Sequence, residues 1–346
     1  MRKFIGKFTN ALFIFTLLIS CAAASEFDEL EPVTIVMADG TAKGAVGNLW
    51  AKLFAQNLAE ITHGKITVDY HGNSELGGDP EIIKKMLAGT VDMCGMQPMN
   101  AVPFIKELGV FELPLVFAKY NAKTIDKVVR PGSEFFSELN KGFRAAGFEL
   151  IDYLQGGTYR EMSSNVPVRK LEDFKGIKIR TLTSEYQVSF WKNLGCEPAP
   201  LPFEGLYDAL KNGVVEAEEN AIDTQANSGF YNVQKYLIFT HHVLYGNIFY
   251  MTSEKFNSLS HSHQKAIRGA AQKTSAQLRR RIREINDEAL RAMMAGQVET
   301  IELSESVIDD IIKATEETSN LIRKNIGDEI CDLLINSLKN EAGIRK

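Results

Sequence analysis

The chain has 346 residues, of which 45% are hydrophobic and 24% are charged, and its formal net charge at pH 7 is −5. This composition is ordinary for a globular protein with room for two cores of domain size, and it argues against a disordered or low-complexity chain. The negative net charge argues against nucleic acid or an anionic membrane as the main partner, but a small anion can still be held by local arginines.

The N-terminus has the layout of a secretory signal. Basic residues within the first seven positions precede an apolar run over residues 11–19, and small residues follow. The run is too short for a membrane span of about 20 residues, so we expect residues 1–24 to be a signal peptide for export to the periplasm. Residues 18–21 (LISC) also resemble a lipoprotein box. Cleavage before Cys21, with a lipid anchor on that residue, therefore stays an alternative to cleavage after residue 24.

The mature chain alternates β-rich and helical segments. Apolar content and alternation predict strands at 33–37, 66–70, 91–96, 148–154, 177–182 and 214–217. Apolar residues at helical spacing predict helices at 46–61, 80–87, 186–194 and 207–210. This alternation predicts an α/β fold with mainly parallel strands flanked by helices.

One continuous helix of roughly 50 Å is expected from His261 to Gly296 because apolar residues recur there at helical spacing. Its basic run allows i,i+4 ion pairs between Arg280 and Glu284 and between Arg283 and Asp287. We therefore interpret the run as a solvated helix face and not as a nucleic-acid patch.

Signatures of catalysis and of cofactor binding are missing from the sequence. It has no dinucleotide or phosphate loop, no H-E-x-x-H pair and no G-x-S-x-G elbow, so we expect neither a cofactor nor a metal. Three widely spaced cysteines beyond the signal form no C-x-x-C motif, and we expect free buried thiols. They are Cys94, Cys196 and Cys331.

Five blocks follow one another in a fixed order along the mature chain. They read NSELGGDPEIIKKMLAGTVDM, FELPLVFA, LEDFKGIKIR, LGCEPAPLPFEGLYDALKNGVVEAEEN and FYNVQKYLIFTHH. With these blocks the chain resembles the solute-binding subunits of tripartite ATP-independent periplasmic (TRAP) transporters, the DctP-like family. The resemblance implies a monomeric, non-enzymatic protein that captures a small organic acid anion, such as a sugar acid, for integral membrane permease subunits.

The resemblance also implies a two-lobed architecture of the periplasmic-binding-protein type. Each lobe is expected to be a mixed sheet flanked by helices, with the long helix spanning both. We expect lobe I to comprise residues 30–153 with about 246–283, and lobe II to comprise residues 154–245 with about 284–340.

Two arginines match the positions at which the family binds the ligand. Arg180 ends the G-x-K-x-R block and matches the anchor of the ligand carboxylate, and Arg160 matches a second arginine after the preceding strand and glycine turn. A guanidinium offers two parallel N–H donors to a carboxylate and stays charged at any relevant pH. The alternatives are structural salt bridges, for which Glu161 and Glu172 are the local partners of Arg160.

Four further positions match the family's binding site. Asn220 matches the asparagine that closes the VEAEEN block, and Phe203 matches an aromatic wall of the pocket. Gln97 and Asp79 resemble specificity positions contributed by the other lobe. A strand-end cap for Asn220 and a core position for Phe203 remain the structural alternatives.

The chain departs from the family where Glu218 and Glu219 stand at positions at which many members carry a glutamine before the asparagine. One rival function is therefore an enzyme acting on a hydroxy or sugar acid, with Glu218, Glu219 or Asp223 as its base. A second rival is a sensory ligand-binding subunit that docks on a receptor instead of a permease.

Overall fold

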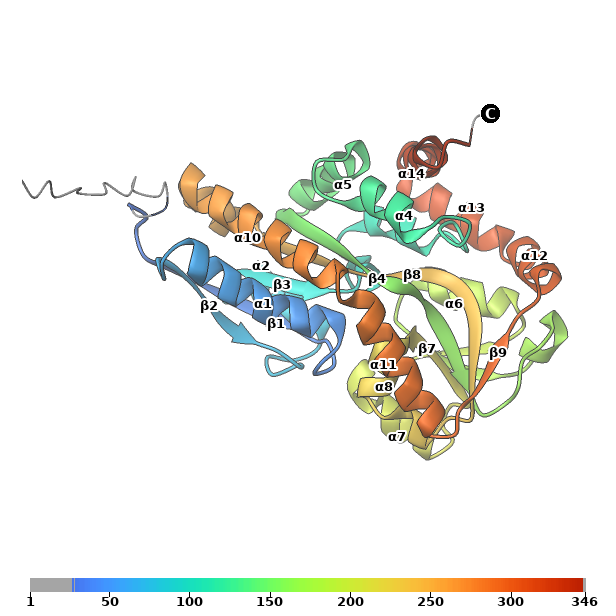
Figure 1. The fold of residues 1–346 in the computed structure, drawn as a ribbon. Coiled ribbons are helices and arrows are strands. Elements are labelled where there is room, and N and C mark those ends of the chain that lie inside the picture. The colour runs from blue at the N-terminus through green and yellow to red at the C-terminus, as the bar shows by residue number, and fades with distance from the viewer. Residues whose placement is uncertain (1–26, 28, 345–346) are drawn as a thin grey trace, which may run out of the picture.

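The structure is a computed structural model that describes residue 27 and residues 29–344, so the expected signal and Cys21 lie outside the described residues. In the described chain, a nine-stranded sheet has the order β2-β1-β3-β8-β4-β7-β5-β6, with β9 beside β8 (Figure 1). The strands are β1 (Val33–Asp39), β2 (Ile66–His71), β3 (Met93–Met96), β4 (Phe148–Ser164), β5 (Lys178–Thr181), β6 (Glu197–Pro200), β7 (Ala217–Ala221), β8 (Tyr236–Thr252) and β9 (Glu299–Glu302).

The two ends of this sheet repeat one parallel arrangement. At the end that we call the β1 side, β1 pairs in parallel with β2 and β3, and α1 (Val46–Ile61) and α2 (Asp79–Leu87) belong to it. At the β5 side, β5 pairs in parallel with β6 and β7, together with α6 (Glu185–Asn193) and α7 (Leu206–Lys211). The predicted mixed α/β fold is confirmed.

Strands β4 and β8, each 17 residues long, run through the centre and join the two sides. They pair antiparallel, and their register shifts between Gln155/Tyr159 and again between Arg160/Met162. Gly157, with φ +71°, lies at the first of these shifts. The strand predicted at 148–154 thus continues ten residues further, through an irregularity that bends it between the two sides.

The expected continuous helix at 261–296 is two helices. α10 (His261–Arg279) packs on α1, α11 (Ile282–Ala295) packs on α8 (Ile222–Asn227), and the direction changes between them (Figure 1). The sheet bends between its two sides, so a straight helix cannot cover both. The solvated face is present: Arg283 lies 3.9 Å from Asp287. In the described residues, no helix is both long and apolar enough for a bilayer span.

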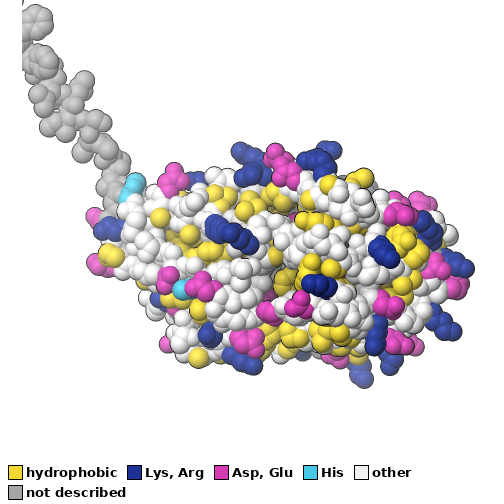
Figure 2. Space-filling view, turned by 90° about the horizontal axis from the view of Figure 1, so that it is seen from below, with side chains coloured by type: hydrophobic (Ala, Val, Ile, Leu, Met, Phe, Trp, Pro, Cys, Tyr) yellow, Lys and Arg dark blue, Asp and Glu magenta, His cyan; other side chains and the backbone are white. Residues whose placement is uncertain are grey.

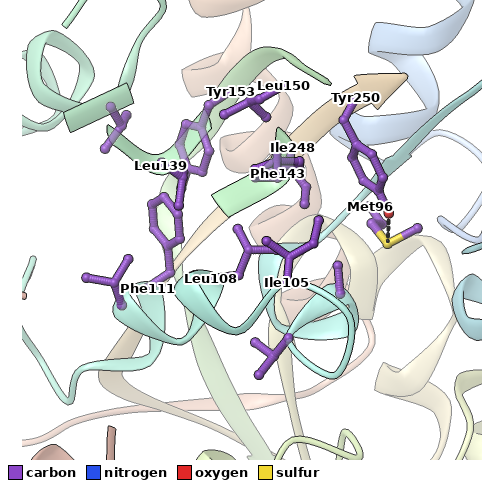
Figure 3. Packing of buried hydrophobic residues seen from close by; sticks show 14 of the residues in the cluster. Met96, Ile105, Leu108, Phe111, Leu139, Phe143, Leu150, Tyr153, Ile248 and Tyr250 are labelled. Carbon is purple, nitrogen blue, oxygen red and sulfur yellow. Dashed lines mark hydrogen bonds between the residues drawn. The ribbon is translucent and has the colours of Figure 1, made fainter. Parts of the chain in front are cut away.

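The largest core lies between the sheet and helices from distant parts of the chain (Figure 3). Phe111 stacks on Tyr153 with ring centroids 5.0 Å apart, and the Tyr250 hydroxyl donates to the Met96 sulfur at 3.4 Å. Its helices include α4 (Ala122–Val129), α5 (Glu134–Ala145), α13 (Glu316–Ile326) and α14 (Asp328–Glu341). Helix α12 (Glu305–Ala314) directly precedes α13 in the chain. Because α14 packs on α4 and α5, the C-terminal segment returns to the N-terminal half of the chain. The predicted residue boundaries of the two lobes stay a prediction.

Two separate cores hold the tryptophans, one on each side of the molecule. Trp50 of α1 packs in the core that α1 shares with α10, Trp191 of α6 packs in the core on the other side, and both side chains are fully buried. The three described cysteines are also buried and free, which confirms the expectation of unpaired thiols.

Candidate ligand-binding site

The carboxyl ends of β1, β3, β5 and β7 face one another between the two sides, where α/β proteins usually bind ligands. Two adjoining cavities, of about 40 Å³ and about 150 Å³, lie at this place. Both are lined by residues from the two sides, including Gly40 and Asp79 from the β1 side and Leu182 and Phe203 from the β5 side. A small molecule held here would contact both sides of the sheet at once.

The structure brings the six predicted site residues to this one place. Five of them line the cavities: Asp79, Gln97, Arg180, Phe203 and Asn220. Arg160 lies behind the wall, where its Nη1 donates to the side-chain oxygen of Gln97. That bond joins the β5 side to the β1 side.

Arg180 is fully buried, but its hydrogen bonds are incomplete. It lies in β5 beside the exposed Lys178, and its Nε donates to the carbonyl of Leu201 at 2.9 Å. Its Nη1 and Nη2 are buried and have no hydrogen-bond partner. Burial lowers the pKa of Arg180 to about 10, so the side chain still carries its charge at neutral pH. Two parallel donors without partners therefore face a cavity.

Arg160, also fully buried, is fully satisfied by its neighbours. Its Nε and Nη2 donate to the carboxylate of Glu219 at 2.5 and 2.7 Å, and Nη2 also donates to the Glu219 carbonyl at 2.7 Å. Neither expected local acid is this partner, because Glu161 bonds to the ring of His241 at 2.7 Å instead. Arg160 thus occupies a structural salt bridge at the wall of the site.

Glu219 binds two basic groups at once. The His242 ring lies 3.1 Å from its carboxylate, in addition to Arg160. Burial alone would raise the pKa of Glu219, but the Arg160 charge and the His242 hydrogen bond lower it to about 2. This carboxylate stays ionised and neutralises Arg160.

Glu218, the neighbouring acid, orients Asn220. The Asn220 amide donates to Glu218 at 3.1 Å, and the hydroxyl of Ser163 donates to the same carboxyl group at 2.6 Å. Burial raises the pKa of Glu218 to about 7. Asn220 is therefore a positioned side chain in the cavity wall, and not a strand-end cap.

Further contacts close the site from both sides. The first amide of α1, on Val46, has no cap in its own segment and donates to the Asp223 carboxylate at 2.9 Å. At the rim, the Ser74 hydroxyl donates to Glu204 at 3.3 Å. Phe203 is partly buried, packs beside Phe230 with ring centroids 6.2 Å apart, and lines both cavities.

Several residues of the site were not predicted from the sequence. Asn100 lines both cavities and donates to Asp79, but it lies in the short helix α3 (Pro98–Ala101), which was not predicted from the sequence. His242 is buried beside Glu219, and no sequence motif indicated it as part of the site. In the described chain, no cluster of His, Cys, Asp and Glu side chains forms a metal site.

Comparison with known proteins agrees with this geometry. Residues 37–324 match the model of bacterial extracellular solute-binding proteins, family 7 (DctP). The 2,3-diketo-L-gulonate-binding periplasmic protein YiaO of Escherichia coli is 28% identical over 253 residues, which are 72% of this chain and 75% of that protein.

Two solved structures are similar over almost their whole length. The sugar acid binding protein DctPAm from Advenella mimigardefordensis, in complex with galactonate, has a TM-score of 0.84 at 26% identity and covers 90% of this chain and 100% of its own. A TRAP periplasmic solute binding protein from Ochrobactrum anthropi has a TM-score of 0.81 at 29% identity and covers 92% of this chain and 98% of its own. The chain belongs to the DctP family of TRAP periplasmic solute-binding proteins, which bind solutes and are not enzymes.

Proposed function

We propose that this protein captures a small carboxylate between its two sides and that Arg180 anchors the carboxylate. The observation that carries the proposal is the pair of buried Arg180 donors, Nη1 and Nη2, which have no partner in the protein. An unsatisfied buried donor costs about 1–3 kcal/mol, and more when it is charged. A carboxylate that accepts both N–H groups removes this cost and contributes a charge-assisted, bidentate hydrogen bond.

The other predicted residues orient the ligand in this proposal. Asn220 and Gln97 supply polar contacts from opposite sides, Phe203 covers the apolar part of the ligand, and Asp79 lies at the end contributed by the β1 side. Arg160 acts indirectly, because its charge is already neutralised by Glu219 and it holds Gln97 in place.

Closure of the two sides completes the site. Arg160–Gln97, Ser74–Glu204 and Val46–Asp223 all bridge the β1 and β5 sides, and each needs the sides to be close together. We infer that the ligand first binds to Arg180 on the β5 side and that the β1 side then closes over it. Closure expels water, which strengthens the charged hydrogen bonds.

The partners proposed for the closed form are the integral membrane subunits of a TRAP permease, and the proposed location is the periplasm. Family membership and the signal-like N-terminus support both. A lipid on Cys21 is an alternative mode of attachment that is compatible with the same role. Charges of both signs are interspersed over the face seen in Figure 2, which is consistent with the lack of a strong basic patch in the sequence.

The three carboxylates that could act as bases in the rival enzyme function have other partners. Glu219 is held by Arg160, Glu218 by Ser163 and Asn220, and Asp223 by the amide of Val46. These bonds support a binding role for the site over chemistry on the ligand.

A thermal-shift screen against organic and sugar acids tests the function. An acid at 100 times its dissociation constant adds about 2.7 kcal/mol to stability, and we expect a rise in Tm of several degrees. Mass spectrometry after long incubation should return that acid unaltered. An acid that is converted, or a complete panel of acids without any shift, would contradict the proposal.

A further inference from the structure

The two cavities contain one basic side chain and several acids. Among the described residues that line them, Arg180 is the single base, whereas Asp79, Glu81 and Glu204 are acids. The second arginine of the site, Arg160, is already neutralised by Glu219. The cavities therefore offer a cation for one ligand carboxylate but none for a second.

Asp79 supplies an acceptor from the side opposite to Arg180. It opens α2, and one of its oxygens accepts a hydrogen bond from Asn100. The other oxygen, Oδ1, is buried without a hydrogen bond of good geometry, although the Gly40 amide points toward it and favours its charge. Gly40 itself has to be a glycine, since a Cβ there would lie 2.5 Å from Oδ1. Asp79 and Gly40 both line the two cavities at this point.

Neighbouring acids increase the negative potential at this end. Burial raises the pKa of Asp79 to about 7, with further contributions from Asp39 and Glu204 and an opposing one from Asn100. A ligand carboxylate placed here would meet like charges in a site from which water is excluded, and that arrangement is unfavourable unless a proton is also bound. A hydroxyl group there would donate to Asp79 without this cost.

The remaining polar lining suits hydroxyl groups. It consists of amide and hydroxyl side chains, which can both donate and accept hydrogen bonds. They are Thr41, Gln97, Asn100, Thr183, Asn220 and Thr224. No described lining residue beyond Arg180 offers a cation for a second anionic group.

We propose that Asp79 determines specificity by selecting monocarboxylates that carry hydroxyl groups and by rejecting dicarboxylates of the same length. This inference rests on the proposed function, because it takes Arg180 as the partner of the first carboxylate. Asp79 accepts a hydrogen bond from a ligand hydroxyl and repels an anionic group in its place.

Matched pairs of sugar acids test the inference by calorimetry at pH 8. Each pair has one chain length and differs only at the terminal group, which is a hydroxymethyl in one acid and a carboxylate in the other: erythronate with meso-tartrate, and galactonate with galactarate. In the pair whose length fits, we expect the monocarboxylate to bind at least tenfold more tightly.

The variant Asp79→Asn removes the charge and keeps the shape of the side chain. We expect the preference to fall below about threefold, with the dicarboxylate gaining affinity and the monocarboxylate losing it. Asp69→Asn is the control, since it makes the same change at an exposed position of β2 on the same side of the molecule. The control should keep the full preference.

The outcomes separate this inference from the function on which it rests. A dicarboxylate that binds the wild-type protein as tightly as its partner acid overturns the role of Asp79 and leaves carboxylate capture intact. The same holds if Asp79→Asn keeps the full preference. If neither acid of either pair binds, the inference is overturned, whereas carboxylate capture is decided separately by the thermal-shift screen over the full panel of acids.

Discussion

Arg160 and Arg180 carry the same charge and are both completely buried, yet their hydrogen bonding within the protein differs. Arg160 makes bidentate bonds to Glu219, while the Nη atoms of Arg180 have no partner. Removing one partner of a buried ion pair leaves the other charge buried and unpaired, which destabilises the folded protein. A buried charge that has no partner destabilises the folded protein before any substitution is made. One arginine therefore stabilises the fold, and the other is held at a cost that a ligand can offset.

This contrast predicts opposite effects on stability. Arg160→Ala should lower the free energy of unfolding by about 3–5 kcal/mol, because Glu219 is left buried and unpaired. Arg180→Ala should lower it by less than about 1 kcal/mol or raise it, because the variant removes an unsatisfied charge. Urea unfolding of the ligand-free proteins measures both. Equal losses in the two variants would show that Arg180 has a structural partner.

Glu112 makes the stability depend on pH. It is buried, one of its oxygens accepts from Ser184 at 2.7 Å, and the other has no partner. Burial raises the pKa of Glu112 to about 8 from its ordinary value of 4.5, so the folded protein holds a proton that the unfolded chain releases between these values. The stability from this group is complete below about pH 4.5 and is lost as the pH rises through about 8.

The variant Glu112→Gln removes this titration. We expect it to be more stable than the wild-type protein by at least about 1 kcal/mol at pH 9, and nearly unchanged relative to the wild type at pH 5. Urea unfolding at the two pH values measures the difference. A variant that is destabilised equally at both would mean that the carboxylate and not the acid is the buried form.

The sequence could predict which residue types meet at the site, but not their partners. Four residues that were selected from family motifs lie around one cavity: Arg160, Arg180, Asn220 and Phe203. Glu219, the acid opposite Arg160, is 59 residues away and faces it only because β4 and β7 pair antiparallel. Local sequence instead suggested acids beside Arg160 in the chain, and these point elsewhere.

Among the secondary-structure elements, β4 is in close contact with the start of α11 at Gly157. A Cβ on Gly157 would lie 2.3 Å from the Cγ2 of Ile282, at the start of α11, and its φ of +71° also favours glycine. The irregular part of β4 thus packs directly against the junction of α10 and α11. Backbone and helix positions are fixed together at this point.

A pair of glycine variants separates strain from contact. Gly176→Ala, with φ +78° and no atom within 4 Å of the added Cβ, should cost about 1–2 kcal/mol from backbone strain alone. Gly157→Ala should cost about 1–3 kcal/mol more, because Ile282 must also shift. The free energy of unfolding in urea gives the comparison. Equal costs would mean that the junction yields without resistance.

Periodicity predicted the outer elements better than the central ones. The helix over 46–61 and the strand at 66–70 alternate apolar and polar positions, the strand at 33–37 is a short apolar run, and the structure confirms all three. Strand β8 is almost entirely buried on both faces, so it shows little alternation and was not predicted from pattern. The break at Arg280 and Arg281 also leaves the helical spacing of apolar residues unchanged on both sides of it.

For the whole molecule, polar contacts bridge the two sides around the cavities. They include Arg160 with Gln97, Ser74 with Glu204, and Asp223 with the Val46 amide. Such contacts can break at little cost in buried apolar area, whereas β4 and β8 continue through both sides. Opening should therefore be a rigid-body motion about these strands.

Small-angle X-ray scattering tests this motion. We expect the radius of gyration to fall when a binding acid is added, because the ligand shifts the population toward the closed arrangement. Asp223→Ala, which loses the bridge to α1, should have a larger radius than the wild-type protein in the absence of ligand. A radius that does not change on binding would contradict closure.

Titration calorimetry of Arg180 variants tests the central claim most directly. With the best acid from the screen, Arg180→Ala should lose at least 100-fold in affinity, since about 3–5 kcal/mol is lost when a buried ion pair is broken. Arg180→Lys should lose nearly as much, because an ammonium cannot reproduce two parallel donors. Unchanged affinity in Arg180→Ala would show that the carboxylate is bound elsewhere.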